Sequence, residues 1–257
     1  MDLSIVIVNY NTKELLMQCI ESIYAAKGDL GCEIIVVDNN SNDGSVRLIK
    51  ENFPFVKLFT NRENIGFSKA NNQGFRVAQA ELIMFLNPDT VVRNGALERI
   101  IDFMKMHQNV GILAPKLIYP DGSLQLSCRS FYNIRTILLR RTLLGRIFHG
   151  SELLKKHVMS ESSHEEIQEI DWALGACLVV PSHVFKKVGG FDEGYKMYFE
   201  DVDLCYRVKK AGCKVCYFPQ AVVVHHHQRE SAGGFSQKTL WHIQSGIRFF
   251  NKHGWQF

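Results

Sequence analysis

Residues 3–45 read LSIVIVNYNTKELLMQCIESIYAAKGDLGCEIIVVDNNSNDGS, and this stretch decides the fold. It opens with a continuous apolar run at residues 3–8, which is typical of a strand buried on both faces. Apolar residues then recur at helical spacing over residues 15–23, with Thr12 as the predicted N-cap, before a second apolar run at residues 34–37. A strand, a helix and a strand joined by short connections predict a βαβ unit and hence a parallel sheet.

The same alternation continues along the chain. We expect further helices at residues 45–51, 67–78 and 95–106, and strands at residues 56–59 and 82–86. Beyond residue 171 we expect a strand at residues 172–180, a helix from Ser182, a turn at Gly189 and Gly190, a helix at residues 202–211, strands near residues 215–218 and 222–225, and a helix at about residues 235–251. Ligands of such sheets bind beyond the carboxyl ends of the strands. The polar segments at residues 9–11, 38–44 and 87–90 are therefore the predicted site.

Composition and charge limit what the protein can be. The 257 residues are 46% hydrophobic and 22% charged, as expected of one globular domain, and a net charge of +4 argues against nucleic acid as a partner. The 7 cysteines are scattered through apolar runs, which indicates buried thiols in a reducing compartment. The sequence has no run of about 18 apolar residues. We therefore expect a cytoplasmic protein whose membrane contact, if it has any, is peripheral at the inner face of the plasma membrane.

Residues 119–170 follow no regular pattern, and we interpret them as a peripheral insertion. Within it, the segment from Ile134 to Phe148 interleaves arginines with large apolar residues. One hypothesis is that this basic amphipathic segment lies on an anionic membrane surface and presents a lipid-linked acceptor. The alternative is a helix that covers the acceptor side of the core.

Two acidic residues follow predicted strands of the first half. Asp38 could accept hydrogen bonds from a nucleoside, or it could belong to a plain Asx-rich loop that caps the next helix. Asp89, in the sequence Asn87-Pro88-Asp89, could bind a hard divalent cation on a diphosphate, or it could be part of a type I turn.

Acidic and imidazole side chains gather in the second half. Residues 199–204 read FEDVDL, and a carboxylate there could take the proton of an attacking hydroxyl, with a pKa raised by its acidic neighbours. The alternative is a set of acids that complement a helix dipole, and we assign Asp203 to that role. Residues 225–227 are all histidine, and one imidazole could complete a metal site with Asp89, whereas surface histidines are the alternative.

These motifs are weak one by one, but their order is specific. The chain carries, in this order, VNY at residues 8–10, VVDNNSNDGS at 36–45, NIGF at 64–67 with Asn71, LNPD at 86–89, DWALGA at 171–176, GGFDE at 189–193, YFEDVDL at 198–204 and a late histidine. This order resembles glycosyltransferase family 2, and within it the bacterial rhamnosyltransferases that build surface polysaccharides from dTDP-rhamnose. The resemblance covers nearly the whole chain except residues 132–169 and includes the Trp241-His242 pair.

The resemblance implies an α/β fold of the GT-A type, with a Rossmann-like, mostly parallel sheet flanked by helices. It implies a single domain in which residues 1–118 bind the nucleotide sugar, residues 119–170 form a variable helical insertion and residues 171–257 hold the acceptor and the catalytic base. The implied reaction is transfer of a sugar with inversion at its anomeric centre, L-rhamnose from dTDP-rhamnose, to a saccharide or lipid-linked saccharide in polysaccharide synthesis of the cell envelope.

The resemblance also assigns roles to residues. Asn9, Asp38 and Asn39 would hold the nucleoside, and Asn64, Gly66 and Asn71 would line the donor pocket. Asp89 and His225 would bind Mg²⁺ or Mn²⁺, Asp201 would be the general base, and Glu200, Trp172 and Asp192 would shape the acceptor side. Two departures from the family pattern matter: Asn87-Pro88-Asp89 stands where a pair of acids is common, and Asp38-Asn39 leaves the choice of base, thymine or uracil, open.

Three other functions are alternatives to this one. A UDP-linked hexose could be the donor, and a catalytically silent protein that binds nucleotide sugars could carry the same motifs. A nucleotidyltransferase lacks support, because no Gly-rich loop with a basic residue follows the first strand.

Overall fold

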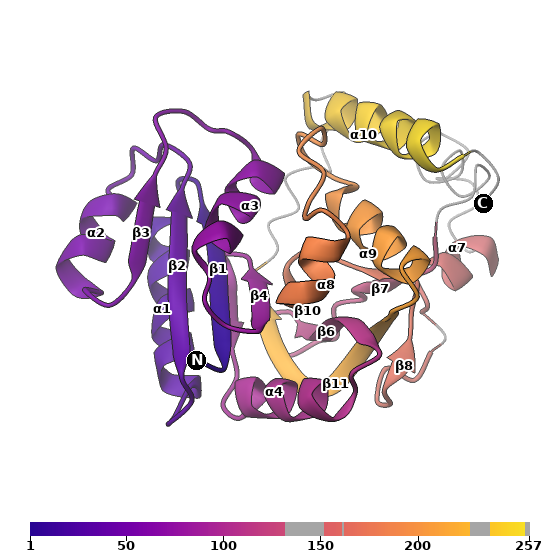
Figure 1. The fold of residues 1–257 in the computed structure, drawn as a ribbon, viewed down its shortest axis with the longest axis horizontal. Helices are drawn as coiled ribbons and strands as arrows, with labels where there is room; N and C mark the ends of the chain where they lie inside the picture. The colour runs from indigo at the N-terminus through magenta and orange to yellow at the C-terminus, as the bar shows by residue number, and fades with distance from the viewer. Residues whose placement is uncertain (132–151, 161, 227–236, 255–257) are drawn as a thin grey trace.

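The computed structural model describes residues 1–131, 152–160, 162–226 and 237–254 (Figure 1). The basic amphipathic segment at residues 134–148 lies outside the described residues, and so does His227. Among the described residues, none of the helices combines the length and the apolar character needed to cross a bilayer.

A mixed sheet forms the centre of the molecule, in the strand order β3-β2-β1-β4-β10-β6-β11-β5, with β8 paired to β11. Its strands are β1 (Leu3–Asn9), β2 (Cys32–Asp38), β3 (Lys57–Thr60), β4 (Leu82–Leu86), β5 (Thr90–Val92), β6 (Val110–Ile118), β8 (Gln168–Glu169), β10 (Cys177–Pro181) and β11 (Lys214–His225). Strands β1, β2, β3 and β4 are parallel, as are β6 and β11, whereas β10 runs antiparallel to both β4 and β6. The carboxyl ends of β1, β2, β4, β6 and β11 therefore share one edge of the sheet, and the predicted mostly parallel sheet is confirmed.

Helices cover both faces of this sheet because β1 is apolar at every position but Ser4 and Asn9. Alternate side chains of a strand point to opposite faces. Leu3, Ile5 and Ile7 pack in one core cluster with α1 (Lys13–Ala26), α2 (Ser45–Asn52) and α4 (Ala96–Met106). Val6 and Val8 belong to a second cluster with α3 (Phe67–Val77), α8 (Ser182–Lys187), α9 (Glu200–Lys210) and α10 (Gln237–His253). A further short helix, α7 (Glu152–His157), follows residues outside the description.

The single strand predicted at residues 172–180 is wrong. The segment forms two strands, β9 (Trp172–Ala173) and β10, separated at residues 174–176. Strand β9 pairs with β7 (Cys128–Arg129) in a separate two-stranded sheet. The break matters for the site, because it exposes the backbone N–H of Gly175 to a side chain of α9.

Two other expectations need correction, and some strands were missed. The two strands predicted near residues 215–218 and 222–225 are one strand, β11, with a register shift between Phe218 and Val222. Strands β5, β6, β7 and β8 were not predicted, and Pro115 inside β6 is unusual in a central strand. Thr12 does occupy the N-cap of α1, but its hydroxyl donates to Oδ1 of Asn9 at 2.6 Å instead of capping the helix.

Candidate active site

The first polar cluster lies where β1 and β2 end side by side. Asn9 pairs in register with Asp38, and its Nδ2 donates to Oδ1 of Asp38 at 2.7 Å. The other carboxylate oxygen of Asp38 accepts the N–H of Ser41 at 2.9 Å. Both predicted side chains are almost fully buried, so the fold holds them in one fixed arrangement. A different residue, Asp43, accepts the N–H of Ser45 at the start of α2. The loop therefore does bond to the next helix, as the alternative interpretation expects, but through Asp43 and not through Asp38.

The segment before α3 closes over this cluster. The Nδ2 of Asn39 donates to the carbonyl oxygen of Gly66 at 3.3 Å, and the side chain of Asn64 accepts the N–H of Gly66 at 3.0 Å. Gly66 has a φ of 86°, which favours glycine over other residues. The structure thus joins Asn39, Asn64 and Gly66, whereas the buried Asn71 donates within α3 to the carbonyl of Phe67 at 3.1 Å.

A carboxylate and an imidazole meet between β4 and β11. Oδ1 of Asp89 lies 3.4 Å from Nε2 of His225. Strand β5 aligns the two, because Thr90 pairs with His225 and the N–H of His226 donates to the carbonyl of Asp89 at 2.8 Å. The sequence predicts this pair, and the structure brings its members together although 136 positions separate them.

Two carboxyl groups, those of Glu200 and Asp201, stand at the start of α9. Asp201 accepts the N–H of Gly175 at 3.0 Å through Oδ2 and the N–H of Val202 at 2.8 Å through Oδ1. Burial raises the pKa of Asp201, and burial together with the charge of Asp201 raises the pKa of Glu200. Each group therefore holds its proton at a higher pH than an ordinary carboxyl group does.

The turn before α9 has a strained backbone. Tyr198 and Phe199 both have positive φ, at 70° and 67°, which residues other than glycine rarely adopt. The ring of Phe199 is buried and lies 5.2 Å from that of His242 on α10, centroid to centroid. Packing of this kind offsets the strain and aims the first residues of α9 at Gly175.

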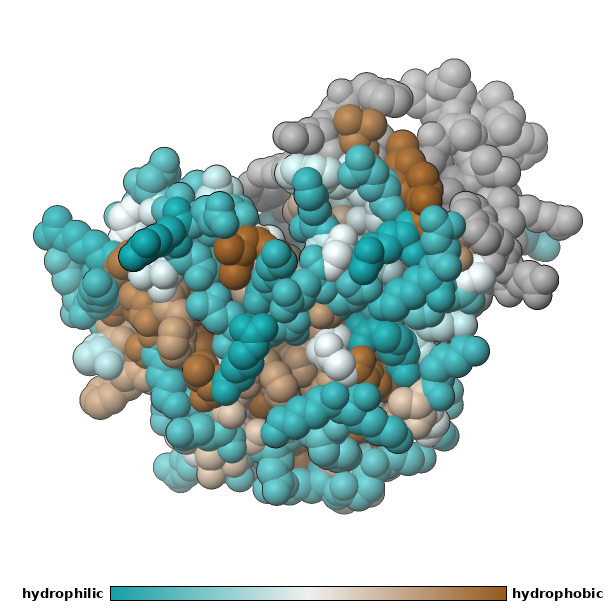
Figure 2. Space-filling model, turned by 45° about the horizontal axis from the view of Figure 1, so that its top comes forward, coloured by the Kyte–Doolittle hydropathy of each residue, from teal (hydrophilic) through white to brown (hydrophobic). Residues whose placement is uncertain are grey.

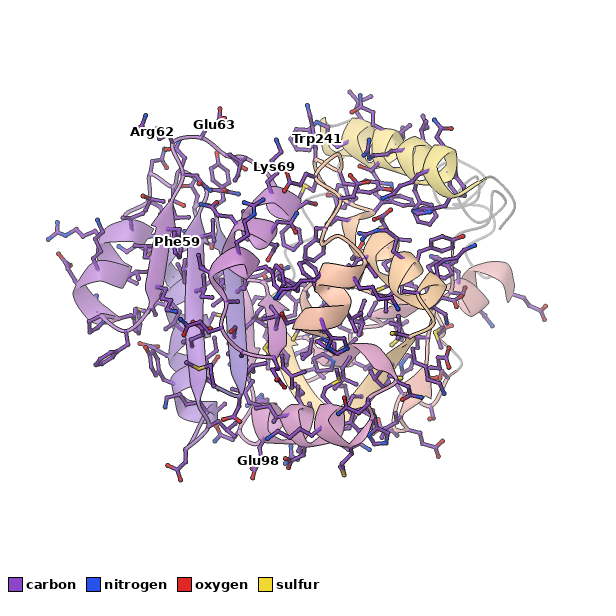
Figure 3. All side chains as sticks on the ribbon, viewed as in Figure 1. Phe59, Arg62, Glu63, Lys69, Glu98 and Trp241 are labelled. Carbon is purple, nitrogen blue, oxygen red and sulfur yellow. The ribbon has the colours of Figure 1, made fainter. Side chains whose placement is uncertain are left out.

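The pair of Asp89 and His225 lies near the pair of Glu200 and Asp201 because β4 and β10 are neighbouring strands. Leu86 pairs with Cys177, and the N–H of Asn87 donates to the carbonyl of Ala176 at 2.9 Å. The loop that carries Asp89 therefore abuts the segment to which Asp201 is hydrogen-bonded. In Figure 3, Lys69 of α3 and Trp241 of α10 lie along the same side of the molecule, with Glu98 of α4 on the opposite side.

The two residues predicted to shape the acceptor side both make contacts within the protein. The indole of Trp172 is buried, and its Nε1 donates to the carbonyl of Ser130 at 3.0 Å. Asp192 accepts hydrogen bonds from Lys252 at 2.7 Å and from Arg248 at 2.8 Å. Although burial opposes it, these bonds lower the pKa of Asp192 well below its usual range. A role at the acceptor stays a prediction for both residues.

Asp203 is more than an acid at the end of a helix. It is fully buried and accepts hydrogen bonds from Arg207 at 2.6 Å, His253 at 2.7 Å and Lys252 at 2.8 Å. Two of these partners belong to α10, which Figure 1 shows lying across α9 at the upper edge of the molecule. The role assigned from the sequence, to complement the helix dipole, stays a prediction, and the structure adds a buried network of side-chain hydrogen bonds that was not predicted.

One site residue was missed. Oε1 of Gln125 lies 2.7 Å from Nδ1 of His225, and Gln125 comes from the range predicted as a variable insertion. A lone glutamine in an irregular segment carries no signal in a single sequence. The contact arises because the chain folds back after β6.

Two family models match this chain. The family model described as "Glycosyl transferase family 2" matches residues 4–157, more than half of the chain. The chain belongs to this family. A second model, "Glycosyl transferase family group 2", matches residues 82–255. The protein is therefore a glycosyltransferase, as its sequence predicts.

Curated relatives of this family 2 glycosyltransferase include two rhamnosyltransferases. The N-acetylglucosaminyl-diphospho-decaprenol L-rhamnosyltransferase of Mycobacterium tuberculosis is 28% identical over 269 residues, which cover 98% of this chain and 86% of the relative. Rhamnosyltransferase WbbL of Escherichia coli K12 is 26% identical over 257 residues, which cover 95% of this chain and 91% of the relative.

Solved structures of similar fold are also glycosyltransferases. GalNAc-T7, solved with UDP, GalNAc and Mn²⁺, matches with a TM-score of 0.71 at 16% identity, over 97% of this chain and 47% of that protein. A mannosyltransferase from Pyrobaculum calidifontis, solved with GDP-Man and Mn²⁺, matches with a TM-score of 0.63 at 19% identity, over 98% of this chain and 63% of that protein. The GT-A fold of this family 2 glycosyltransferase is thereby confirmed.

Proposed function

We propose that the protein transfers L-rhamnose from dTDP-rhamnose, with inversion at the anomeric carbon, to a hydroxyl group of a saccharide or lipid-linked saccharide. The observation that carries the proposal is the position of Asp201, whose partly buried carboxyl group is hydrogen-bonded to Gly175, beside the loop that carries Asp89 and its partner His225. The two rhamnosyltransferase relatives support the choice of sugar, and one of them is named for a diphospho-decaprenol acceptor.

In this proposal residues 1–118 supply the donor half. Asn9, Asp38 and Asn39 hold the nucleoside at the ends of β1 and β2, where fixed carboxylate and amide groups meet the donors and acceptors of a base and ribose. Asn64, Gly66 and Asn71 line the donor pocket. The hydrogen bonds among these residues preorganise the pocket, so little side-chain freedom is lost when the donor binds.

Asp89 and His225 would hold a divalent cation, Mg²⁺ or Mn²⁺. The residues fit such an ion: a carboxylate oxygen and an imidazole nitrogen 3.4 Å apart are both ligand types that Mn²⁺ accepts. The described residues contain no group of three or more histidine, cysteine or acidic side chains that could hold a metal, so the remaining ligands would be diphosphate oxygens and water. A bound divalent cation would offset the charge that develops on the departing diphosphate.

Residues 171–257 supply the acceptor half and the base. Asp201 takes the proton of the acceptor hydroxyl as its oxygen attacks the anomeric carbon and the bond from that carbon to the diphosphate breaks. A general base works best when its pKa lies near the working pH, and the raised pKa of Asp201 meets that need. Glu200, Trp172 and Asp192 shape the acceptor side around it.

The deciding experiment is a panel of nucleotide sugars, tested for thermal stabilisation with and without Mn²⁺ and then for sugar transfer. We expect selective stabilisation by dTDP-rhamnose. Selective stabilisation by a UDP-linked hexose would replace the donor and keep the enzyme. Asp201→Asn tests the base: it should abolish transfer while donor binding is retained, whereas a catalytically silent binding protein would keep its biological activity.

Membrane contact through residues 134–148 is part of the same proposal, because a lipid-linked acceptor lies at a membrane surface. Arg140 and Arg141 are the charges to change. Replacing both with Glu should reduce co-sedimentation with liposomes that contain anionic lipid, because each basic residue near such a surface adds about 1 kcal/mol. Unchanged binding would refute this contact.

A further inference from the structure

The segment that follows β6 returns to the site through a tight turn. Ile118 pairs with Leu124 in an antiparallel bridge, and the N–H of Gln125 donates to the carbonyl of Leu117 at 2.9 Å. Gly122, with a φ of 84°, allows the turn between them. Because Leu117 pairs in register with Val223 of β11, the turn sets Gln125 down beside the end of β11.

Gln125 contacts the side of the His225 ring that faces away from Asp89. Its Oε1 lies 2.7 Å from Nδ1 of His225, and both residues are less than 5% exposed. An amide oxygen can only accept a hydrogen bond, so Nδ1 must carry the proton in this contact. In a neutral ring, Nε2 then keeps its lone pair, and Nε2 is the atom 3.4 Å from Oδ1 of Asp89.

We propose that Gln125 is a positioning residue that fixes His225 in the Nδ1–H tautomer and orients Nε2 toward a divalent cation shared with Asp89. The proposal rests on the proposed function, because that function places the cation there. Histidines that bind metals commonly donate their other N–H to an oxygen acceptor, which fixes the tautomer and the ring orientation.

Packing alone does not account for an amide at this position. Gln125 is 3% exposed, and its Nε2 is buried without a hydrogen-bond partner among the described residues. A buried donor of this kind is costly, and an apolar side chain of the same size would avoid the cost. The hydrogen bond from His225 to Oε1 is therefore the interaction that the amide adds.

Two variants separate these effects. Gln125→Leu removes the acceptor, and Gln125→Glu keeps an acceptor oxygen while it alters only the end that lacks a protein partner. Gln108→Leu is the matched control, because Gln108 is exposed and, among the residues that the structure describes, its side chain bonds only to the carbonyl of Lys105. The tautomer of His225 is read from the ¹⁵N spectrum of metal-free, histidine-labelled protein at pH 8, with the signal assigned from the His225→Asn spectrum. The affinity for Mn²⁺ in the presence of dTDP is measured by electron paramagnetic resonance.

The wild type and Gln108→Leu should both show the Nδ1–H tautomer and the same Mn²⁺ affinity. Gln125→Leu should shift His225 toward the Nε2–H tautomer and weaken Mn²⁺ binding by about 10- to 100-fold. Gln125→Glu should keep both properties of the wild type or bind Mn²⁺ more tightly.

An unchanged tautomer and affinity in Gln125→Leu would overturn the proposal. If that variant does not fold, loss of the Nδ1–H tautomer in Gln125→Glu overturns it equally. A third outcome is possible: the wild type shows the Nδ1–H tautomer, Gln125→Leu loses it, and the wild type binds no Mn²⁺ in the presence of dTDP. That outcome would support the positioning contact and remove the metal from the proposed function.

Discussion

Asp201 accepts two backbone hydrogen bonds that favour its charged form, and burial still outweighs them. The base must be deprotonated to accept a proton, so transfer is expected to fall as the pH drops through the raised pKa of Asp201. The acidic limb of kcat/KM should therefore lie above about pH 4, where an ordinary Asp titrates. A profile measured across pH 4 to 9 checks this, and a limb at or below the ordinary value would contradict it.

The residue scale also separates what the sequence can predict from what it cannot. Asp89 and His225 are predictable because each follows an apolar strand, and parallel strands end at one edge of the sheet. Gln125 is not, because its partner lies 100 positions away and the contact depends on a turn that no periodic pattern marks. The strained Phe199 is likewise invisible until its packing against α10 is seen.

At the scale of elements, α3 lies against β1 because Gly74 has no side chain. A Cβ at Gly74 would clash with Cγ1 of Val6, whose side chain is fixed in the sheet. Gly74→Ala must therefore push α3 outward, and α3 carries Asn71 and follows its N-cap, Gly66. We expect a loss of about 1–3 kcal/mol in the free energy of unfolding.

The displacement of α3 should also weaken donor binding. Nucleotide-sugar affinity is measured by calorimetry, and stability by urea unfolding. Gly28→Ala is the control, because a Cβ at Gly28 would meet nothing within 4 Å, although its own positive φ costs some stability. Donor affinity that drops equally in both variants would contradict the expectation.

Helices α9 and α10 are joined by Asp203. Its pKa is lowered, although burial opposes this, because Arg207, Lys252 and His253 stabilise its charged form. Asp203→Asn leaves Arg207 and Lys252 without their counter-charge and should cost about 3 kcal/mol of unfolding free energy at pH 7.

The sign of the pH dependence follows from the lowered pKa of Asp203. The stability that this carboxylate contributes is fully present above its unfolded pKa, near pH 4, and is lost as the pH falls through the lower folded pKa. The difference in urea midpoint between wild type and Asp203→Asn should shrink as the pH is lowered from 5 toward 2. A difference that stays constant over this range would show that the carboxylate acts by packing alone.

Helices and strands were predicted best where each apolar run in the sequence forms a single strand or one face of a single helix. The alternation up to residue 86 predicted the right order of strands and helices because each βα unit is local, whereas the short β5 was missed. The run from Trp172 to Val180 did not, because WALGACLVV looks continuous while Gly175 turns its N–H toward Asp201, 26 positions on. Likewise nothing local indicates that β10 runs opposite to both neighbours.

At the scale of the whole molecule, the edge of the sheet where β1, β2 and β4 end, which is the proposed donor site, is part of a largely hydrophilic face. Figure 2, turned so that this edge comes forward, shows mostly hydrophilic side chains with separate hydrophobic patches. Such a face suits a charged nucleotide sugar. Ligand binding should therefore appear as global stabilisation: a donor at 100 times its Kd adds about 2.7 kcal/mol to the free energy of unfolding.

Removal of divalent cations tests whether donor binding depends on a metal. EDTA should abolish transfer and most of the stabilisation by dTDP-rhamnose, and added Mn²⁺ should restore both. Asp89→Asn should need far more Mn²⁺ for the same effect, because it removes the carboxylate. Differential scanning fluorimetry measures the shift in Tm. Full stabilisation by the donor in EDTA would contradict a role for metal in donor binding.

Strand β10 has a consequence for how this chain could be redesigned. It arrives from the C-terminal part of the sequence and inserts between β4 and β6, both of which belong to the N-terminal part. The two parts of the chain therefore contribute alternating strands to one sheet, and neither part can complete the backbone hydrogen bonds of its strands without the other. A chimera that takes one part from a relative must therefore preserve strand pairing on both sides of β10, with β4 and with β6. Substrate specificity is for this reason more safely changed by exchanging single loops.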